Sequence, residues 1–285
     1  MKYLFLILIS CLFFSCEKET ESTSPNLIVK FKFDPTQVRL NNIGQPANIP
    51  TGNAGQTPVF NSISAHYFEL TPNMYTQLGD GAVLYHAPET MAGGTTAIDF
   101  SQAKIVSENE AFLTIPLDQV TPGIYEWVRV SLSYQNFSVN LLHNNQNYAA
   151  TLESFVGYNT YLTSHNIGQN IFPVNGNRAQ GYWAFALNNF PYATSGQAPA
   201  GATTVPNPLF ASSPIPQGSC VVTGDFNSPL QINGNETKDI EITLSLSVNN
   251  SFEWTEVNTD GLYEPSAGEH VVDMGLRGLK PSFIK

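Results

Sequence analysis

The sequence predicts an all-β fold, an antiparallel β-sandwich-like single domain with long loops. Apolar residues recur at every second position in several short segments, which is the period of a half-buried strand. Charged residues make up only 12% of the chain, whereas it holds 21 Gly and 19 Pro. This composition is typical of short strands joined by many turns. The residues from 26 to 285 suit one large β domain.

The first expected strands lie in the N-terminal third of the domain. Leu27, Val29, Phe31 and Phe33 alternate with Ile28, Lys30 and Lys32 and predict a strand with one buried face. The segments Ser62–Leu70 and Ala82–His86 are also extended in character, with the turn Gly79-Asp80-Gly81 between them. We expect these two segments to pair as a hairpin.

Further strand signals follow in the middle and at the end of the chain. Ala111–Ile115 predicts a strand that ends at Pro116, and Ile124–Ser133 predicts the longest strand. Phe137–Leu142 is expected to return beside it. Ile240–Val248 has the cleanest alternation in the chain and predicts a further strand.

The segment 189–217 contains six Pro residues, at 191, 199, 206, 208, 214 and 216. Proline removes a ladder hydrogen bond, so this segment cannot supply central strands. It is either a long surface loop or a linker between two subdomains. We favour a loop within one domain, because the remaining C-terminal segment is too short to build a separate core.

The N-terminal segment has the features of an export signal. Lys2 precedes an apolar run that ends at Phe14, which is shorter than the roughly 20 residues that a membrane span needs. Residues 1–15 therefore predict a signal peptide. Ser15-Cys16 resembles the lipobox of bacterial lipoproteins, so we expect Cys16 to be acylated. The alternatives are a signal cut elsewhere and a short anchor that is retained.

Residues 16–25 are polar and predict a disordered tether between Cys16 and the domain. Acidic residues directly after Cys16 resemble the surface-export signal of Bacteroidetes lipoproteins. The expected partner of the N-terminus is thus a lipid bilayer. The expected location is the cell envelope, as an outer membrane-anchored lipoprotein that is periplasmic or surface-exposed.

Charge and cysteine content exclude some function classes. The net charge of −11 argues against nucleic acid as a partner, because nucleic-acid binding depends on neutralising phosphates. After export, Cys220 is the one cysteine left besides Cys16, so no disulfide is expected within the domain. Cys220 stands in an apolar setting, which favours a buried, inert thiol over a metal or redox role.

Several segments together resemble one family. Ile63–Leu70, Val120–Val128, Gly181–Phe185 and Ile242–Asn249 are similar, in this order, to segments of the MbnP-like periplasmic proteins, which are associated with copper. The resemblance implies a shared fold and a copper-related role. The family carries a His-x-Gly element after its Gly-Tyr pair, and at that place this chain has Leu187-Asn188-Asn189-Phe190.

Metal binding is the first functional hypothesis. His66 and His86 lie on two strands that are expected to pair, and neutral imidazole suits copper or zinc. We therefore select both as candidate metal ligands, with copper as the candidate ion. A hydrogen-bonded histidine at the edge of the core is the alternative for His66. His143 and His165 are expected in loops, and His270 at the start of a strand.

Catalysis has weaker support in the sequence. The nucleophile elbow, the zinc-protease helix, the P-loop and the dinucleotide-binding glycine pattern are all missing from the sequence. Glu126, Glu241 and Glu253 are strand-associated carboxylates that a glycosidase would need in a pair, but spacing alone does not bring them together. The sequence favours a non-catalytic role and leaves an enzyme open.

Two further function classes stay open. Trp127, Trp183 and Trp254 could stack on sugar rings, which predicts a carbohydrate- or peptide-binding surface lipoprotein as an alternative. Aromatic residues are also common in strands for packing alone. The second alternative is a structural or assembly component of the outer envelope. The sequence names no protein or small-molecule partner.

Overall fold

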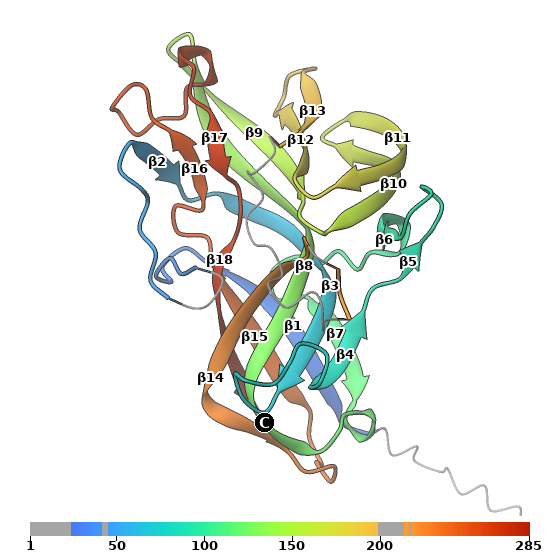
Figure 1. Cartoon of the computed structure of the whole chain (residues 1–285). Helices are drawn as coiled ribbons and strands as arrows, with labels where there is room; N and C mark the ends of the chain where they lie inside the picture. The colour runs from blue at the N-terminus through green and yellow to red at the C-terminus, as the bar shows by residue number, and fades with distance from the viewer. Residues whose placement is uncertain (1–23, 42–44, 199–213, 217) are drawn as a thin grey trace, which may run out of the picture.

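The alternating segments form strands, as their period requires, and in a computed structural model the chain is all-β (Figure 1). The structure describes residues 24–41, 45–198, 214–216 and 218–285. The signal peptide, Cys16 and nearly all of the tether lie outside the described residues. Within the described ranges, the helical elements are three-residue 3₁₀ turns: η1 (Phe100–Gln102), η2 (Leu117–Gln119) and η4 (Pro265–Ala267).

The first sheet joins the two ends of the domain. Its central strand β1 pairs in parallel with β15, with Leu27 opposite Ile240, and antiparallel with β7. The last strand, β18, pairs antiparallel with β15. In order across the sheet, the strands are β18 (Arg277–Ile284), β15 (Ile240–Ser247), β1 (Asn26–Asp34) and β7 (Ala111–Pro116).

The second sheet is built around β8, which runs from the lower half of Figure 1 into the upper half. One edge of β8 pairs with β3, and the other pairs first with β14 and then with β9. The strands of this sheet are β13 (Ala193–Gln197), β12 (Tyr182–Leu187), β9 (Gln146–Phe155), β8 (Gly123–His143), β3 (Val59–Thr71) and β4 (Ala82–His86), with β14 (Cys220–Ile232) beside β8.

Two smaller sheets complete the upper half. One is the hairpin of β10 and β11 with the short strands β5 and β6, and the other joins β16, β17 and β2. The first contains β11 (Asn170–Ala179), β10 (Asn159–Ile167), β6 (Ala97–Asp99) and β5 (Glu89–Thr90). The second contains β17 (Val271–Asp273), β16 (Phe252–Thr255) and β2 (Asn53–Gln56).

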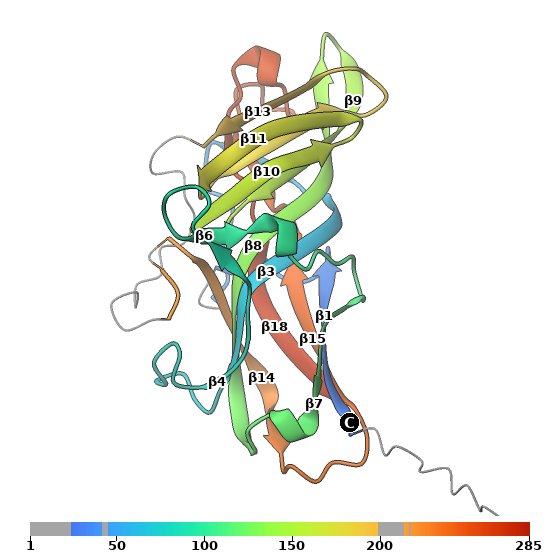
Figure 2. The same cartoon turned by 90° about the vertical axis from the view of Figure 1, so that its right-hand side faces the viewer.

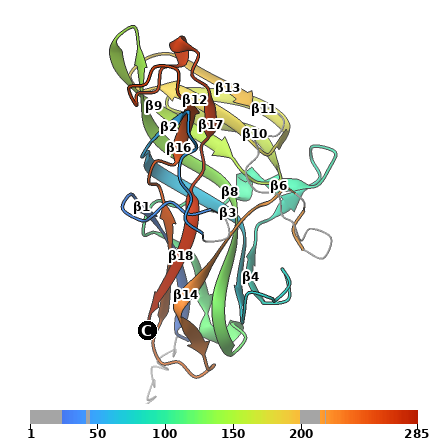
Figure 3. The ribbon, with the colours of Figure 1, turned by 60° about the vertical axis from the view of Figure 1, so that its left-hand side comes forward.

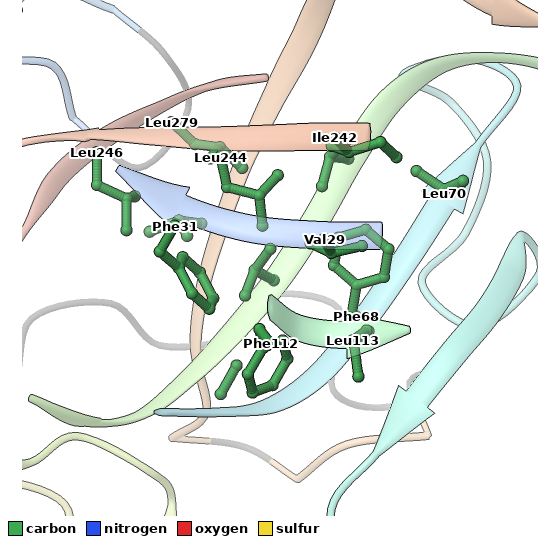
Figure 4. Packing of buried hydrophobic residues seen from close by; sticks show 14 of the residues in the cluster. Val29, Phe31, Phe68, Leu70, Phe112, Leu113, Ile242, Leu244, Leu246 and Leu279 are labelled. Carbon is green, nitrogen blue, oxygen red and sulfur yellow. The ribbon is translucent and has the colours of Figure 1, made fainter. Parts of the chain in front are cut away.

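The main core lies in the lower half, between the first sheet and the lower part of the second. Figure 2 shows β1 and β15 on one side of this half and β3, β4 and β8 on the other. The buried side chains of β1, β15, β7 and β3 meet between these layers, where Phe31 and Phe112 pack with ring centroids 5.2 Å apart (Figure 4). The two layers therefore form a sandwich.

The two sheets approach each other closely along β14 and β18. A Cβ at Gly224 of β14 would lie 2.3 Å from the carbonyl oxygen of Leu279 on β18, so a larger residue does not fit there. Glycine at this position lets the backbones come together. The sandwich is thus nearly closed along this side.

The predicted strands are confirmed with some differences. The segments 62–70 and 82–86 pair as the expected hairpin, with Tyr67 opposite His86. The prediction that Phe137–Leu142 returns beside the long strand is wrong, because these residues continue β8 to His143. The chain turns only at Asn144 and Asn145, which both have positive φ, as a tight hairpin turn requires.

Two other expectations need correction. The segment 189–217 is not loop throughout, because β13 forms within it and pairs with β12 at the edge of the sheet. The five residues of β13 contain no Pro, so they can pair; residues 199–213 and 217 lie outside the described part. The pairing is also not entirely antiparallel, since β1 and β15, and likewise β10 and β6, are parallel.

Within the described ranges we find no helix with the length and apolar character that a bilayer crossing needs.

We predict that Phe31→Ala lowers the free energy of unfolding by about 3–5 kcal/mol, because it leaves a cavity in the main core. Phe31 has no exposed surface, and its ring contacts Phe112. Denaturant unfolding of the full chain measures the change. Tyr75→Ala is the control, since this side chain is 85% exposed and its loss should change stability by less than about 0.5 kcal/mol. Equal losses for both variants would contradict the assignment of the core.

Candidate metal centre

Two strands and the turn between β4 and β5 bring three potential metal ligands together. His66 lies on β3, His86 is the last residue of β4, and Glu89 is the first residue of β5. Because β3 and β4 pair with Tyr67 opposite His86, the two histidines are cross-strand neighbours. Ala87-Pro88 then ends β4 and turns the chain back, so that Glu89 faces both rings.

The backbone of His66 is irregular, and this irregularity positions its side chain. Ala65 pairs with Leu132 and Tyr67 with Ser131, so His66 has no partner residue on β8. Its carbonyl oxygen instead accepts a hydrogen bond of 2.7 Å from the N–H of Ala87. A bulge of this kind redirects a side chain out of the regular alternation and is frequent beside functional sites.

The potential ligand atoms of the three residues all lie within 4.8 Å of one another. Oε1 of Glu89 is 3.1 Å from Nε2 of His66 and 3.7 Å from Nε2 of His86. The centroids of the two imidazole rings are 4.6 Å apart. The side chain of His66 is fully buried, whereas that of His86 is 41% exposed. The cluster therefore opens to solvent on one side.

Tyr158 lies between β9 and β10 and holds Glu89 from the other side. Its hydroxyl group donates a hydrogen bond of 2.8 Å to Oε1 of Glu89. Its ring packs against the ring of His66, with centroids 5.4 Å apart. One carboxylate oxygen is thus the common partner of an imidazole and a phenol, which fixes its position.

The electrostatics of the cluster favour the protonation states that bind metal. Burial, and then the neighbouring His66 ring, hold the pKa of His86 below its usual value, whereas Glu89 acts to raise it. The hydrogen bond from His66 holds the pKa of Glu89 below its usual value. A neutral imidazole and an ionised carboxylate are the forms that coordinate a cation.

One polar atom of the cluster has no partner. Nδ1 of His66 is buried and makes no hydrogen bond to any of the described residues. Leaving such an atom unsatisfied costs about 1–3 kcal/mol, so native structures rarely do so without an ion, a water molecule or a functional reason. This atom is not the nitrogen that faces Glu89, which is Nε2, so a metal bound at Nε2 would not be its partner.

The donor set fits a borderline transition metal. Two imidazole nitrogens and one carboxylate oxygen suit copper or zinc. Tetrahedral coordination at about 2.0–2.1 Å would place the ligand atoms about 3.3 Å apart, and the 3.1 Å and 3.7 Å separations to Glu89 lie on both sides of this value. A fourth position would remain open to solvent.

The other three histidines do not join this cluster. His270 directly precedes β17, as expected. The prediction that His143 lies in a loop is wrong, because it is the last residue of β8, where it is exposed and contacts Asn144. The prediction that His165 lies in a loop is wrong. It is a buried residue of β10, where its Nδ1 lies 2.9 Å from Oε2 of Glu153. Glu153 also accepts a hydrogen bond from the hydroxyl group of Tyr134.

The carboxylates considered for catalysis have separate environments. Glu126 is exposed on β8, Glu241 forms an ion pair with Lys30, and Glu253 is buried in an ion pair with Arg39. Cys220 is buried at the start of β14, as expected.

The tryptophans differ in their surroundings. Trp254 is fully buried, Trp127 is half-buried on β8, and Trp183 lines a cavity in the upper half.

The sequence indicated His66 and His86 but not Glu89. The spacing His86-x-x-Glu89 was the available signal, but it requires the turn at Pro88 to bring both side chains to one point. Tyr158 is 69 residues from Glu89, so nothing local could identify it. Comparison with protein-family models, with curated proteins and with solved structures finds no match for this chain.

We predict that Glu89→Gln lowers the pKa of His86 further. The negative charge of Glu89 favours the imidazolium form and raises this pKa, so its removal acts in the opposite direction. NMR titration of the His86 ring protons in the metal-free full chain measures the shift. Glu126→Gln removes an exposed carboxylate elsewhere and should leave the His86 titration unchanged. An upward shift in Glu89→Gln would show that the three groups are not arranged as described.

Proposed function

We propose that the chain is a cell-envelope lipoprotein that binds a divalent transition metal, with copper as its ion, through His66, His86 and Glu89. The observation that carries the proposal is the convergence of three ligand atoms within 4.8 Å of one another, one of them on a fully buried histidine. The resemblance to the MbnP-like proteins supports the same ion. Copper(II) also has the highest affinity among the divalent first-row metals for a site of this kind.

The accessibility of the centre supports a role in metal handling. His66 anchors the site from the buried side, while His86 and Glu89 are partly exposed. With three protein ligands, a further position stays open to water or to a ligand from another molecule. An ion held in this way can be passed on, whereas a closed four-ligand site would retain it.

We expect the full chain to bind copper stoichiometrically, and His86→Asn to weaken this binding. Loss of a ligand should exceed the about 10–100-fold that loss of a second-shell partner costs. The chain is stripped with a chelator and titrated with copper(II) or zinc(II). Bound metal is counted by elemental analysis, and nitrogen coordination is read from the electron paramagnetic resonance spectrum of copper.

Two further variants make this test specific. Tyr158→Phe removes the hydroxyl group that fixes Glu89 and should weaken copper binding by about 10-fold. His143→Asn removes an exposed histidine outside the cluster and should bind copper like the unmodified chain. If the unmodified chain binds neither metal, or if His86→Asn binds as tightly, the proposal is wrong.

We also propose that Cys16 carries the lipid that attaches the chain to a membrane, because Ser15-Cys16 directly follows the apolar run. Cys16→Ser should abolish incorporation of a clickable palmitate analogue and release the chain from the membrane fraction. Cys11→Ser changes the other cysteine of the N-terminal segment and should keep both properties. Persistence of the label in Cys16→Ser would contradict the proposal.

A further inference from the structure

A cavity of about 1070 Å³ lies in the upper half, apart from the residues of the metal centre. One wall is the sheet of β8, β9, β12 and β13, and the opposite wall is β16 and β17 with the segment 263–270. Figure 3 shows these elements together in the upper part of the molecule. Its volume lies just above the range of about 300–1,000 Å³ for ligand pockets.

The walls of the cavity are mainly aromatic and aliphatic. Rings come from both sides, including Trp183 and Phe185 of β12 and Tyr263 before η4. Leu141 and Leu152 are among the aliphatic side chains between them. A ligand that fills this space would therefore exchange water for apolar contacts on two faces, which is the main source of affinity in such pockets.

The mouth of the cavity exposes more apolar surface than a surface loop needs. Phe190 and Tyr192 are both more than half exposed, and both line the cavity. The ring of Phe190 packs edge-on against Tyr148, and the ring of Tyr192 against Phe185. These aromatic pairs continue the apolar lining outward to the surface.

The two carboxylates on the walls already have partners. The buried carboxylate of Glu269 accepts hydrogen bonds from the N–H groups of Val257, Asn258 and Glu264. Asp273 forms an ion pair with Arg277. Both carboxylates are thus occupied and the rest of the wall is mainly apolar, whereas the hydroxyl groups of a sugar need partners when they are buried.

The charge of the lining also selects the ligand. The lining residues include no Lys or Arg among those that the structure describes, whereas they do include the carboxylates of Glu269 and Asp273. An anionic group placed in the cavity would meet the carboxylate of Glu269 and find no lysine or arginine of the lining to pair with. The ligand that fits best is uncharged.

We infer that this cavity binds the apolar part of a neutral amphipathic lipid, either an acyl chain or a fused-ring system. The apolar part lies between β12 and Tyr263, and the uncharged polar end lies at the mouth. There Thr194 and His270 offer polar atoms. The binding site is separate from the proposed metal centre and does not depend on it.

Photolabelling of the full chain in isolated cell envelopes tests this inference. Three diazirine probes are compared: a monoacylglycerol, a sterol and a fatty acid. Labelled peptides are mapped by mass spectrometry. A neutral probe should label peptides that cover 139–152 and 183–198, and excess unlabelled compound should suppress the labelling. The two neutral probes distinguish an acyl chain from a ring system, and the fatty acid should label at least about 10-fold less.

Two variants place a charge in the cavity. Phe185→Glu puts a carboxylate in the wall, and Phe190→Glu puts one at the mouth, on a side chain that is 52% exposed. Both should reduce labelling by about 10-fold or more, because a ligand that covers either position would bury the carboxylate beside an apolar group. Ile171→Glu is the control, since Ile171 is 70% exposed on β11 and does not line the cavity.

Three outcomes would overturn the inference. The first is labelling spread over the chain that the mouth variant Phe190→Glu does not change. The second is fatty-acid labelling equal to that of the neutral probes, which would refute the argument from charge. The third is binding of glycans on an array without specific labelling by either neutral lipid, which would make the cavity a sugar site.

Discussion

The hydrogen bonding of β8 along both of its edges is the constraint on which the remaining structure depends. One edge pairs with β3, and the other changes from β14 to β9 near Ser133. At this change the carbonyl oxygen of Ser133 accepts hydrogen bonds from Val156 and Gly157 rather than from a strand partner. On β3, which pairs with the other edge of β8, the register shifts between Ala65 and Tyr67, at His66. The irregular pairing at the junction of the two halves thus also positions the side chain of His66, the buried ligand of the candidate metal centre.

Buried carboxylates hold loops in place around this framework. Glu69 accepts hydrogen bonds from the N–H groups of Gly79 and Gly81, and burial raises its pKa. Arg129 lies beside Glu69 and donates to the carbonyl groups of Met74 and Thr76 in the same loop. Each such acid satisfies backbone donors that a loop would otherwise leave unpaired. These acids therefore organise the loops, and their presence inside the protein is no sign of catalysis.

The sequence predicts the strands that have one buried face, and the prediction fails where this alternating pattern ends. Ile240–Val248 alternates because one face packs in the core, so its period was visible. The end of β8 was assigned to a separate strand, because residues 128–135 are buried on both faces and interrupt the alternation, which returns only from 136 to 143. His165 resembled a loop residue, since the partner that allows its burial, Glu153, is on another strand. The place of Glu89 in the site depends on the turn at Pro88 and on the hydrogen bond from Tyr158, and the local sequence reveals neither.

The parallel pairing of β1 with β15 has a consequence for how the chain reaches its folded state. Asn26 and Asp239, which touch at the start of this pair, are 213 residues apart in the sequence. Contacts over such separations require closure of a very long loop, so they form slowly. The lower sandwich cannot assemble until the C-terminal strands have been synthesised. During that interval β1 lacks its parallel partner β15, so one face of the lower core stays uncovered until translation reaches the end of the chain.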